Sequence, residues 1–290
     1  MPTHNDAQIA EWNGEQGQRW AQQQRTLDAM IGPFGDAALQ AAAAQPGEQV
    51  IDIGCGCGST TLTLARAVGP SGQVLGVDVS QPMLAIARAA AADAAAASPA
   101  SARAALSFIE ADAATAALPL GQDLLFSRFG LMFFDAPAAA LRHLRGALRE
   151  GGRCAFVCWR TPRDNPWAMV PLMAARKALD ITPPPADPLA PGPFAFADDV
   201  RLRGLLVEAG FSDIDIQRCD ATIAIGATPR AAAEHSLNLG PASRLAREVG
   251  PAFHARIVDA IEQALVPLAA ADRTVGLSGS TWVVTASRSA

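Results

Sequence analysis

The chain has 290 residues, 50% of which are hydrophobic, and a formal net charge of −5. That length suits one large α/β domain, or such a domain with a helical cap, and it can bury a full core. The acidic balance excludes nucleic-acid binding through a basic face, because phosphate contacts require clustered Lys and Arg side chains.

The first twenty residues are polar and lack the apolar centre of a signal peptide. No apolar run reaches the roughly 18 residues that a membrane span needs. The five cysteines are an odd number, which indicates free thiols in a reducing compartment rather than a disulfide framework. We therefore expect a cytoplasmic protein that does not interact with a membrane.

Residues 1–45 contain two helical patterns ahead of the first expected strand. Aromatic residues at helical spacing are usually part of a core, so burial against a sheet is one interpretation of this segment. A lid over a ligand is the other. The apolar residues recur at mixed three- and four-residue spacing: Ile9, Trp12, Trp20, Leu27, Met30 and Phe34.

The stretch QVIDIGCGCGS at residues 49–59 predicts a strand, a tight turn and the start of a helix. Its glycines, Gly54, Gly56 and Gly58, have no Cβ atoms and permit the positive φ angles that such a turn needs. A ligand can therefore lie directly on the backbone. A dinucleotide-binding loop would have glycine at the first, third and sixth positions, but the sixth position here is Ser59.

Three acidic residues are expected at the carboxyl ends of successive strands. Asp52 lies in the first strand, Asp78 ends the strand at 73–77, and Asp112 follows the strand at 106–109. The carboxylate of Asp78 can accept hydrogen bonds from both hydroxyls of a ribose. Three carboxylates suit a ligand with a ribose, an amine and a positive charge, and they would repel a pyrophosphate. S-adenosylmethionine fits this description.

At this point the sequence resembles the class I S-adenosylmethionine-dependent methyltransferases, in particular the small-molecule branch typified by the ubiquinone and menaquinone biosynthesis methyltransferases. The resemblance extends from about residue 49 to residue 160. Five stretches are similar to the family's successive motifs and occur in the same order: DIGCGCG, GVDVSQPMLAIAR, EADAATAAL, DLLFSRFGLMFF and LREGGRCAFVCW.

The resemblance implies roles for the residues that follow each strand. Asp78 would bind the ribose, Asp112 and the backbone of Ala113 would hold the edge of the adenine, and Met83 would pack on its face. Met83 could equally fill a gap in the core. Asp52 would orient the loop and the amine indirectly. The residues expected to bind the cofactor are Trp20, Asp52, Gly54, Gly56, Gly58, Asp78, Val79, Met83, Asp112, Ala113 and Ser127.

The remaining elements alternate between strand and helix up to residue 160, which predicts a parallel sheet covered on both faces. We expect helices at 85–97 and 137–148, the latter stopped by Glu150, Gly151 and Gly152, and strands at 123–126 and 153–159. A Pro-rich connection at 182–193 follows a short helix at 167–179. Then come a helix at 198–209 and two strands, at 214–225 and 280–287.

The fold class that we expect is α/β, a doubly wound, seven-stranded, mostly parallel sheet of the Rossmann-like methyltransferase fold with an antiparallel last strand and a helical cap. Residues 1–45 would form a helical lid segment, with Trp20 nearest the methionine end of the cofactor. Residues 46–227 and 271–290 would form the cofactor-binding domain. Residues 228–270 would be a cap, whose apolar face packs on the sheet domain or on a second subunit of a possible homodimer.

The residues after the fourth and fifth strands are expected to line a dry acceptor pocket. Arg128, among them, would pair with an acidic substrate or, in the favoured interpretation, with a structural carboxylate. His235 and His254 in the cap could each act as a general base, although a solvated surface histidine is the simpler interpretation. The expected acceptor residues are Phe129, Met132, Phe133, Trp159, Asn165, Trp167 and His235.

Cys55 and Cys57 suggest a metal site, but two ligands do not make one, and no further ligands occur at zinc spacing. We therefore expect no metal. The function that we expect is methyl transfer from S-adenosylmethionine to an O, N, S or C atom of a small, largely apolar molecule. The alternatives are another use of the cofactor, such as aminopropyl transfer, and a cofactor-binding regulator without chemistry.

Overall fold

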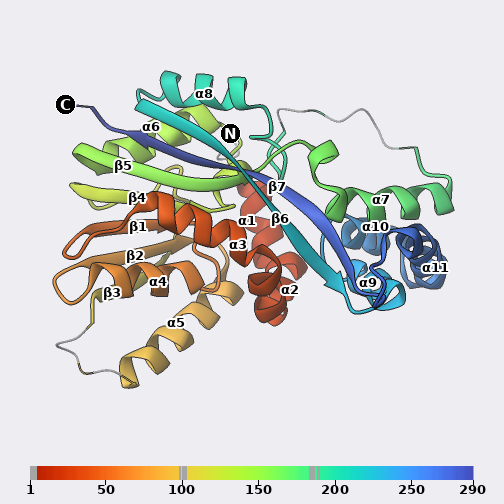
Figure 1. Cartoon of the computed structure of the whole chain (residues 1–290). Coiled ribbons are helices and arrows are strands. Elements are labelled where there is room, and N and C mark those ends of the chain that lie inside the picture. The colour runs from red at the N-terminus through yellow and green to blue at the C-terminus, as the bar shows by residue number, and fades with distance from the viewer. Residues whose placement is uncertain (1–4, 98, 100–102, 183–186, 188–189, 290) are drawn as a thin grey trace. The chain divides into compact units, whose positions relative to one another are not determined.

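The computed structural model describes residues 5–97, 99, 103–182, 187 and 190–289 (Figure 1). Half of the expected Pro-rich connection at 182–193 and the position of Ser98, just after the expected helix at 85–97, lie outside these residues. The chain forms two compact units. The sheet unit comprises residues 1–159, 190–219 and 281–290, and the helical unit comprises residues 160–189 and 220–280.

Seven strands form one sheet in the order β3-β2-β1-β4-β5-β7-β6 (Figure 1). Neighbouring strands among β1 to β5 are parallel, and β7 is antiparallel to β5. This arrangement confirms the expected fold class. The strands are β1 Gln49–Ile53, β2 Gln73–Asp78, β3 Ala105–Glu110, β4 Gln122–Arg128, β5 Leu148–Trp159, β6 Ser212–Gly226 and β7 Val275–Ser287.

Helices cover both faces of the sheet, because parallel strands joined by crossovers bury both of their sides. The helices α3, α4 and α5 lie on one face, and α6 and α8 lie on the other (Figure 1). The central strands are accordingly apolar, with Ile51 and Leu124 fully buried. The helices are α3 Gln24–Ala42, α4 Ser59–Val68, α5 Gln81–Ala96, α6 Pro137–Ala147 and α8 Asp199–Glu208.

The segment before β1 contains three helices instead of the two expected from its pattern. Helix α1 Asp6–Asn13 ends at Gly14, whose backbone is extended, and α2 Glu15–Gln22 ends at Gln23. Helix α3 then continues through Pro33 and buries Phe34 completely. The short polar helices α1 and α2 have too few apolar residues to show their separate boundaries in the sequence.

Two strands are longer than the sequence pattern indicated. Strand β5 begins at Leu148, although the strand was expected to begin at Arg153, after a helix stop formed by Glu150, Gly151 and Gly152. Its register against β4 shifts between Gln122 and Leu124, and Gly151 has a φ of 71° within this irregularity. The glycines therefore form an irregular stretch of strand and not a helix stop. Strand β7 likewise begins at Val275, five residues before the expected start.

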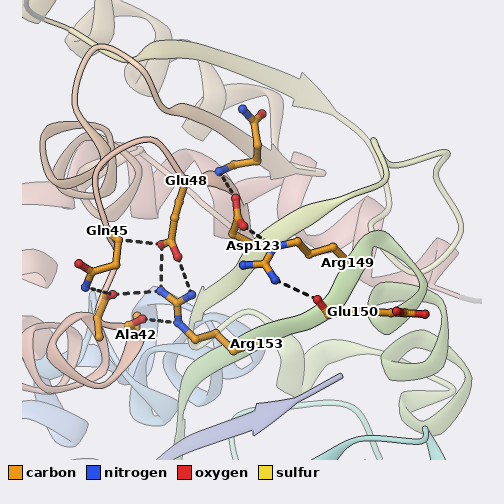
Figure 2. A network of polar contacts seen from close by, with 9 residues as sticks. Ala42, Gln45, Glu48, Asp123, Arg149, Glu150 and Arg153 are labelled. Atoms are coloured by element: carbon orange, nitrogen blue, oxygen red, sulfur yellow. Dashed lines mark hydrogen bonds and ion pairs between the residues drawn. The ribbon is translucent and has the colours of Figure 1, made fainter. Parts of the chain in front are cut away.

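An ion-pair network holds the amino-terminal edge of the sheet (Figure 2). The guanidinium of Arg153 donates to both carboxylate oxygens of Glu48, at 2.8 and 2.9 Å. It also donates to the carbonyls of Ala42 and Ala43, where α3 ends. A second pair joins Arg149 to Asp123 beside it. Arg153 thus ties the end of α3 to β5 and compensates the negative end of the helix.

The helical unit contains the four α-helices α7 Pro166–Leu179, α9 Pro229–Ser236, α10 Pro241–Val249 and α11 His254–Leu265 within the described residues. Helix α11 packs against α7 and α9 and fully buries Ile257, Ile261 and Leu265. The apolar face of the segment 228–270 is therefore covered within its own unit, by a helix that precedes β6. No helix in the described ranges is long and apolar enough to cross a membrane.

Candidate active site

The glycine loop after β1 lies at the carboxyl edge of the sheet, with φ angles of 65°, 55° and 81° at Gly54, Gly56 and Gly58. A Cβ atom at Gly54 would lie 2.8 Å from Gly130 Cα, and one at Gly56 would lie 2.7 Å from Met83 Cε. Both separations are too short for real atoms. The loop therefore requires glycine for its backbone conformation and, at Gly54, for its close approach to the backbone of Gly130 just after β4.

Asp78 holds the middle of this loop. Its two carboxylate oxygens accept the backbone N–H groups of Gly56, at 2.7 Å, and of Ser80, at 2.8 Å. Desolvation raises the pKa of Asp78, and these backbone hydrogen bonds offset part of the rise. A carboxylate has about four lone-pair positions, so Asp78 keeps acceptor capacity for a ligand beside its backbone partners, which include Val79.

Asp52 lies beneath the loop and is completely buried. Its Oδ2 accepts hydrogen bonds from the hydroxyls of Thr60 and Thr61, at 2.9 and 2.7 Å. Burial raises the pKa of Asp52 to about 6, against the lowering effect of these hydroxyls and of the Arg128 charge. Asp52 thus anchors the first turn of α4 to β1, and it exposes no surface to a ligand.

Asp112, after β3, has a partner that the sequence did not indicate. The side-chain amide of Asn5 donates to both Asp112 oxygens, at 3.0 and 3.1 Å, and Ala114 N–H donates to Oδ1. Asn5 also exchanges hydrogen bonds with Asp135, one in each direction, at 2.8 Å. Asn5 is buried at a φ of 80°, a conformation that asparagine tolerates. The buried, left-handed asparagine carries no periodic signal in a sequence.

The same N-terminal segment binds the chain just after β2. Asn13 donates to the carbonyl of Val79 at 2.8 Å and accepts from the N–H of Gln81 at 3.0 Å. The Ser80 hydroxyl donates to the carbonyl of Trp12 at 2.7 Å. The N-terminal segment, which the sequence predicted as a lid, therefore contacts the residues that follow β2 and β3, where the ribose and adenine are expected.

An aromatic cluster continues this contact. The ring of Trp12 meets Trp20 and Phe133 edge to face, with centroid distances of 5.4 and 5.3 Å. Trp20 was expected to bind the cofactor, and Phe133 was expected to bind the acceptor. Each ring packs against Trp12, which the sequence analysis did not assign to a site.

Two further expected cofactor residues support the loop from neighbouring elements. The Ser127 hydroxyl donates to the carbonyl of Ile53 and accepts the N–H of Gly130. It therefore braces the ends of β1 and β4 against each other. Met83 and Ala113 are both buried.

Arg128, the last residue of β4, pairs with a structural carboxylate, as the favoured interpretation predicted. Its Nη2 lies 2.8 Å from Asp28 Oδ1 and donates to Ser59 Oγ at 2.9 Å. The Ser59 hydroxyl donates to Asp28 at 3.1 Å. This triad joins α3, the first residue of α4 and β4. The sequence did not indicate Asp28, which lies between Leu27 and Met30 in a pattern interpreted only for its apolar residues.

The acceptor residues expected in the sheet unit form a dense apolar group. The rings of Phe129 and Trp159 stack with centroids 4.5 Å apart, and Phe34 packs edge to face on both. Phe129 has a φ of 62°, a strained conformation for an aromatic residue. The backbone N–H of Trp159 donates to the sulfur of Met132, with the nitrogen 3.4 Å from Sδ. Strain of this kind concentrates at functional sites.

The other expected acceptor residues lie in the helical unit. Asn165 is fully buried and makes internal hydrogen bonds to Ser280 and Trp167, so its amide is already committed. Desolvation lowers the pKa of half-buried His235. The contact of Asn165, Trp167 and His235 with an acceptor stays a prediction.

The thiols of the loop are not poised for chemistry. Burial raises the pKa of Cys57 to about 12 and that of Cys55 well above its usual range. Among the residues that the structure describes, no three His, Cys, Asp or Glu side chains gather as metal ligands.

A family model described as a methyltransferase domain matches residues 50–152. Nocamycin O-methyltransferase of Saccharothrix syringae is 30% identical over 202 residues, which make up 63% of this chain and 69% of that protein. The ubiquinone/menaquinone biosynthesis C-methyltransferase UbiE of Shewanella frigidimarina is 28% identical over 185 residues, which make up 61% and 71% of the two chains.

The fold is similar to that of phosphoethanolamine N-methyltransferase 2 of Haemonchus contortus, solved with S-adenosyl-L-methionine. The TM-score is 0.57 at 17% identity, and the match covers 97% of this chain and 59% of that one. The family model matches the region of the motifs, and nocamycin O-methyltransferase is 30% identical over 69% of its own length. The chain therefore belongs to the S-adenosylmethionine-dependent methyltransferases.

Proposed function

We propose that this enzyme methylates a small, largely apolar molecule, at an oxygen or a carbon atom. The relatives support the choice of atom, because one is named as an O-methyltransferase and the other as a C-methyltransferase. The apolar, aromatic surroundings of β4 and β5 support the choice of acceptor. Phe129, Met132 and Trp159 are buried in these surroundings and have no charged side chain that would favour a polar acceptor.

The cofactor site fits a sulfonium nucleoside. The three glycines have positive φ angles and close neighbours in the chain, so they form the tight turn whose backbone a ligand would approach. Asp78 keeps acceptor capacity beside Gly56, where a ribose would donate both hydroxyls. We assign the ribose to Asp78. We assign the adenine to Asp112 and Ala113, with Val79 and Met83 against its faces.

The cofactor supplies an activated methyl group, so the chain has to align the acceptor, exclude water and, for some acceptors, remove one proton. The lid segment α1–α2 would exclude water, because Asn13 and Trp12 hold it on the chain after β2. Trp20 belongs to that lid. His235 stays a candidate base, as proposed from the sequence, and desolvation lowers the pKa of its half-buried imidazole.

The observation that carries this proposal is the arrangement of Asp112, Asp78 and the glycine loop on three adjacent strands. The test is incubation of the protein with methyl-labelled S-adenosylmethionine and a panel of phenols, enols, thiols and amines, followed by mass spectrometry. We expect a product with one added methyl group from an apolar oxygen or carbon acceptor. Methylation confined to amines, or no turnover of any small molecule, would contradict the proposal.

A further inference from the structure

The Arg128–Asp28 pair borders the glycine loop on the side away from Asp78. Both side chains contact Ser59, the residue that directly follows Gly58. The loop therefore has a carboxylate at its middle, where Asp78 accepts Gly56 N–H, and an ion pair at its end. The charges of Asp28 and Arg128 also act on the Cys57 thiol within the loop.

The pair retains capacity for a further partner. All of the Arg128 hydrogen bonds within the described residues come from Nη2, so Nε and Nη1 donate to no described group. The Arg128 side chain is 17% exposed and that of Asp28 is 28% exposed. Asp28 Oδ2 has only a 3.5 Å contact with Gln24.

Gly35 keeps space open along the guanidinium. A Cβ atom at this position in α3 would lie 2.9 Å from Arg128 Cδ and 3.7 Å from Nη1. The absence of a side chain at Gly35 thus allows Arg128 to lie along α3 beside the carboxyl edge. This close approach directs the side chain back toward Asp28 and Ser59.

The four positions follow the order of the strands. Asp112 comes after β3, Asp78 ends β2, the glycine loop follows β1, and Arg128 ends β4, and these strands are adjacent in that sequence. Adjacent strands lie about 4.8 Å apart, so the row spans roughly 14 Å. An extended ligand with adenine and ribose over β3 and β2 therefore has its other end near β4.

We infer that Arg128 and Asp28 bind the zwitterionic amino-acid end of the cofactor, an inference that rests on the cofactor assigned above. The carboxylate would accept hydrogen bonds from Arg128 Nε or Nη1, and the ammonium would donate to Asp28. An arginine and an aspartate with opposite charges complement a zwitterion without changing the net charge of the site. Ser59 keeps the two side chains together at the loop.

The test is calorimetric titration with two ligands that differ in this one part. S-adenosylhomocysteine has the amino-acid end, and 5′-methylthioadenosine has the same adenosine and sulfur without it. We expect Arg128→Met to weaken S-adenosylhomocysteine by about tenfold or more, equal to about 1.4 kcal/mol, and to leave 5′-methylthioadenosine unchanged. Asp28→Asn should weaken the same ligand selectively.

Arg149→Met is the matched control, because Arg149 also pairs with an aspartate but lies at the opposite edge of the sheet. It should bind both ligands as the wild type does. Arg128→Lys keeps the positive charge beside Asp28, so it is the variant to measure if Arg128→Met does not fold. It should lose part of the discrimination between the two ligands.

Equal losses for both ligands in a folded Arg128 variant would show that the residue only shapes the loop, and would overturn the inference. Unchanged binding of both ligands would overturn it as well. Failure of the wild type to bind either ligand would instead contradict the cofactor assignment. The two conclusions can therefore fail separately.

Discussion

The side-chain amide of Asn5 donates to both carboxylate oxygens of Asp112, so the N-terminal segment that we propose as a lid holds the acidic residue that we assign to the adenine. Asn5 is in turn fixed by two hydrogen bonds to Asp135. In the proposed lid, closure and the orientation of Asp112 would therefore favour each other. Because coupling between two binding events is reciprocal, cofactor binding should also stabilise the lid.

Asn5→Ala should weaken cofactor binding through the adenosine part. The variant loses hydrogen bonds to a charged group, worth about 1.5–3 kcal/mol, and frees the Asp112 side chain to rotate. Calorimetry should therefore show similar losses for S-adenosylhomocysteine and 5′-methylthioadenosine, unlike the Arg128 variants. Asn238→Ala, in an exposed position, is the control. Unchanged affinity for both ligands would show that the lid contact does not act on the site.

Asp78→Ala should weaken S-adenosylhomocysteine by about 1.5–3 kcal/mol, the usual loss for hydrogen bonds to a charged group. The structure adds a cost in stability, because the variant leaves the N–H groups of Gly56 and Ser80 without their acceptor. Titration and thermal unfolding of the same samples measure the two effects. A folded variant with unchanged affinity would mean that another group binds the ribose.

Asp52 predicts a pH dependence of stability. Its pKa rises from 3.8 to about 6 in the folded chain, so between these values the folded state binds more protons than the unfolded state. The free energy of unfolding should therefore fall as the pH rises, by up to about 3 kcal/mol from this residue. The stabilising contribution of protonated Asp52 is fully present below about pH 3.8 and is lost as the pH rises through about 6.

The comparison that isolates this effect is denaturant unfolding of wild type and Asp52→Asn at a series of pH values. Asparagine can still accept from Thr60 and Thr61, but it does not titrate. The variant should gain stability relative to the wild type as the pH rises from 4 to 7. Parallel pH profiles for the two proteins would show that Asp52 titrates normally.

At the amino-terminal edge of the sheet, we expect two arginines to differ in their contribution to the free energy of unfolding (Figure 2). Arg153→Met should lower the free energy of unfolding by about 2–4 kcal/mol, because it leaves Glu48 and the end of α3 without their partner. Arg149→Met should cost less than about 1 kcal/mol, because Arg149 is 50% exposed. Urea unfolding measures both, and equal losses would contradict the burial argument.

Much of the fold could be predicted because it depends on local patterns. The strand residues before the glycine loop and the alternation of strands and helices set the order of the central sheet. The boundaries of β5 and β7 could not be predicted, because an irregular glycine stretch and an alternation that includes Gly276 and Ser278 do not resemble a strand.

The site was predictable where a residue follows a strand and contacts a ligand through its own chemistry, as for Asp78. It was not predictable where a distant residue supplies the partner. Asn5 lies 107 positions from Asp112, and Asp28 lies 100 positions from Arg128. Such pairs depend on tertiary packing of the lid and of α3, which no local pattern encodes.

The central claim is that the cofactor lies along the carboxyl edge of β3, β2, β1 and β4, and a crystal structure with S-adenosylhomocysteine bound tests it most directly. We expect adenine beside Asp112, both ribose hydroxyls within hydrogen-bond distance of Asp78, and the amino-acid carboxylate at Arg128. A ligand bound elsewhere, or in the opposite direction along these strands, would contradict the account.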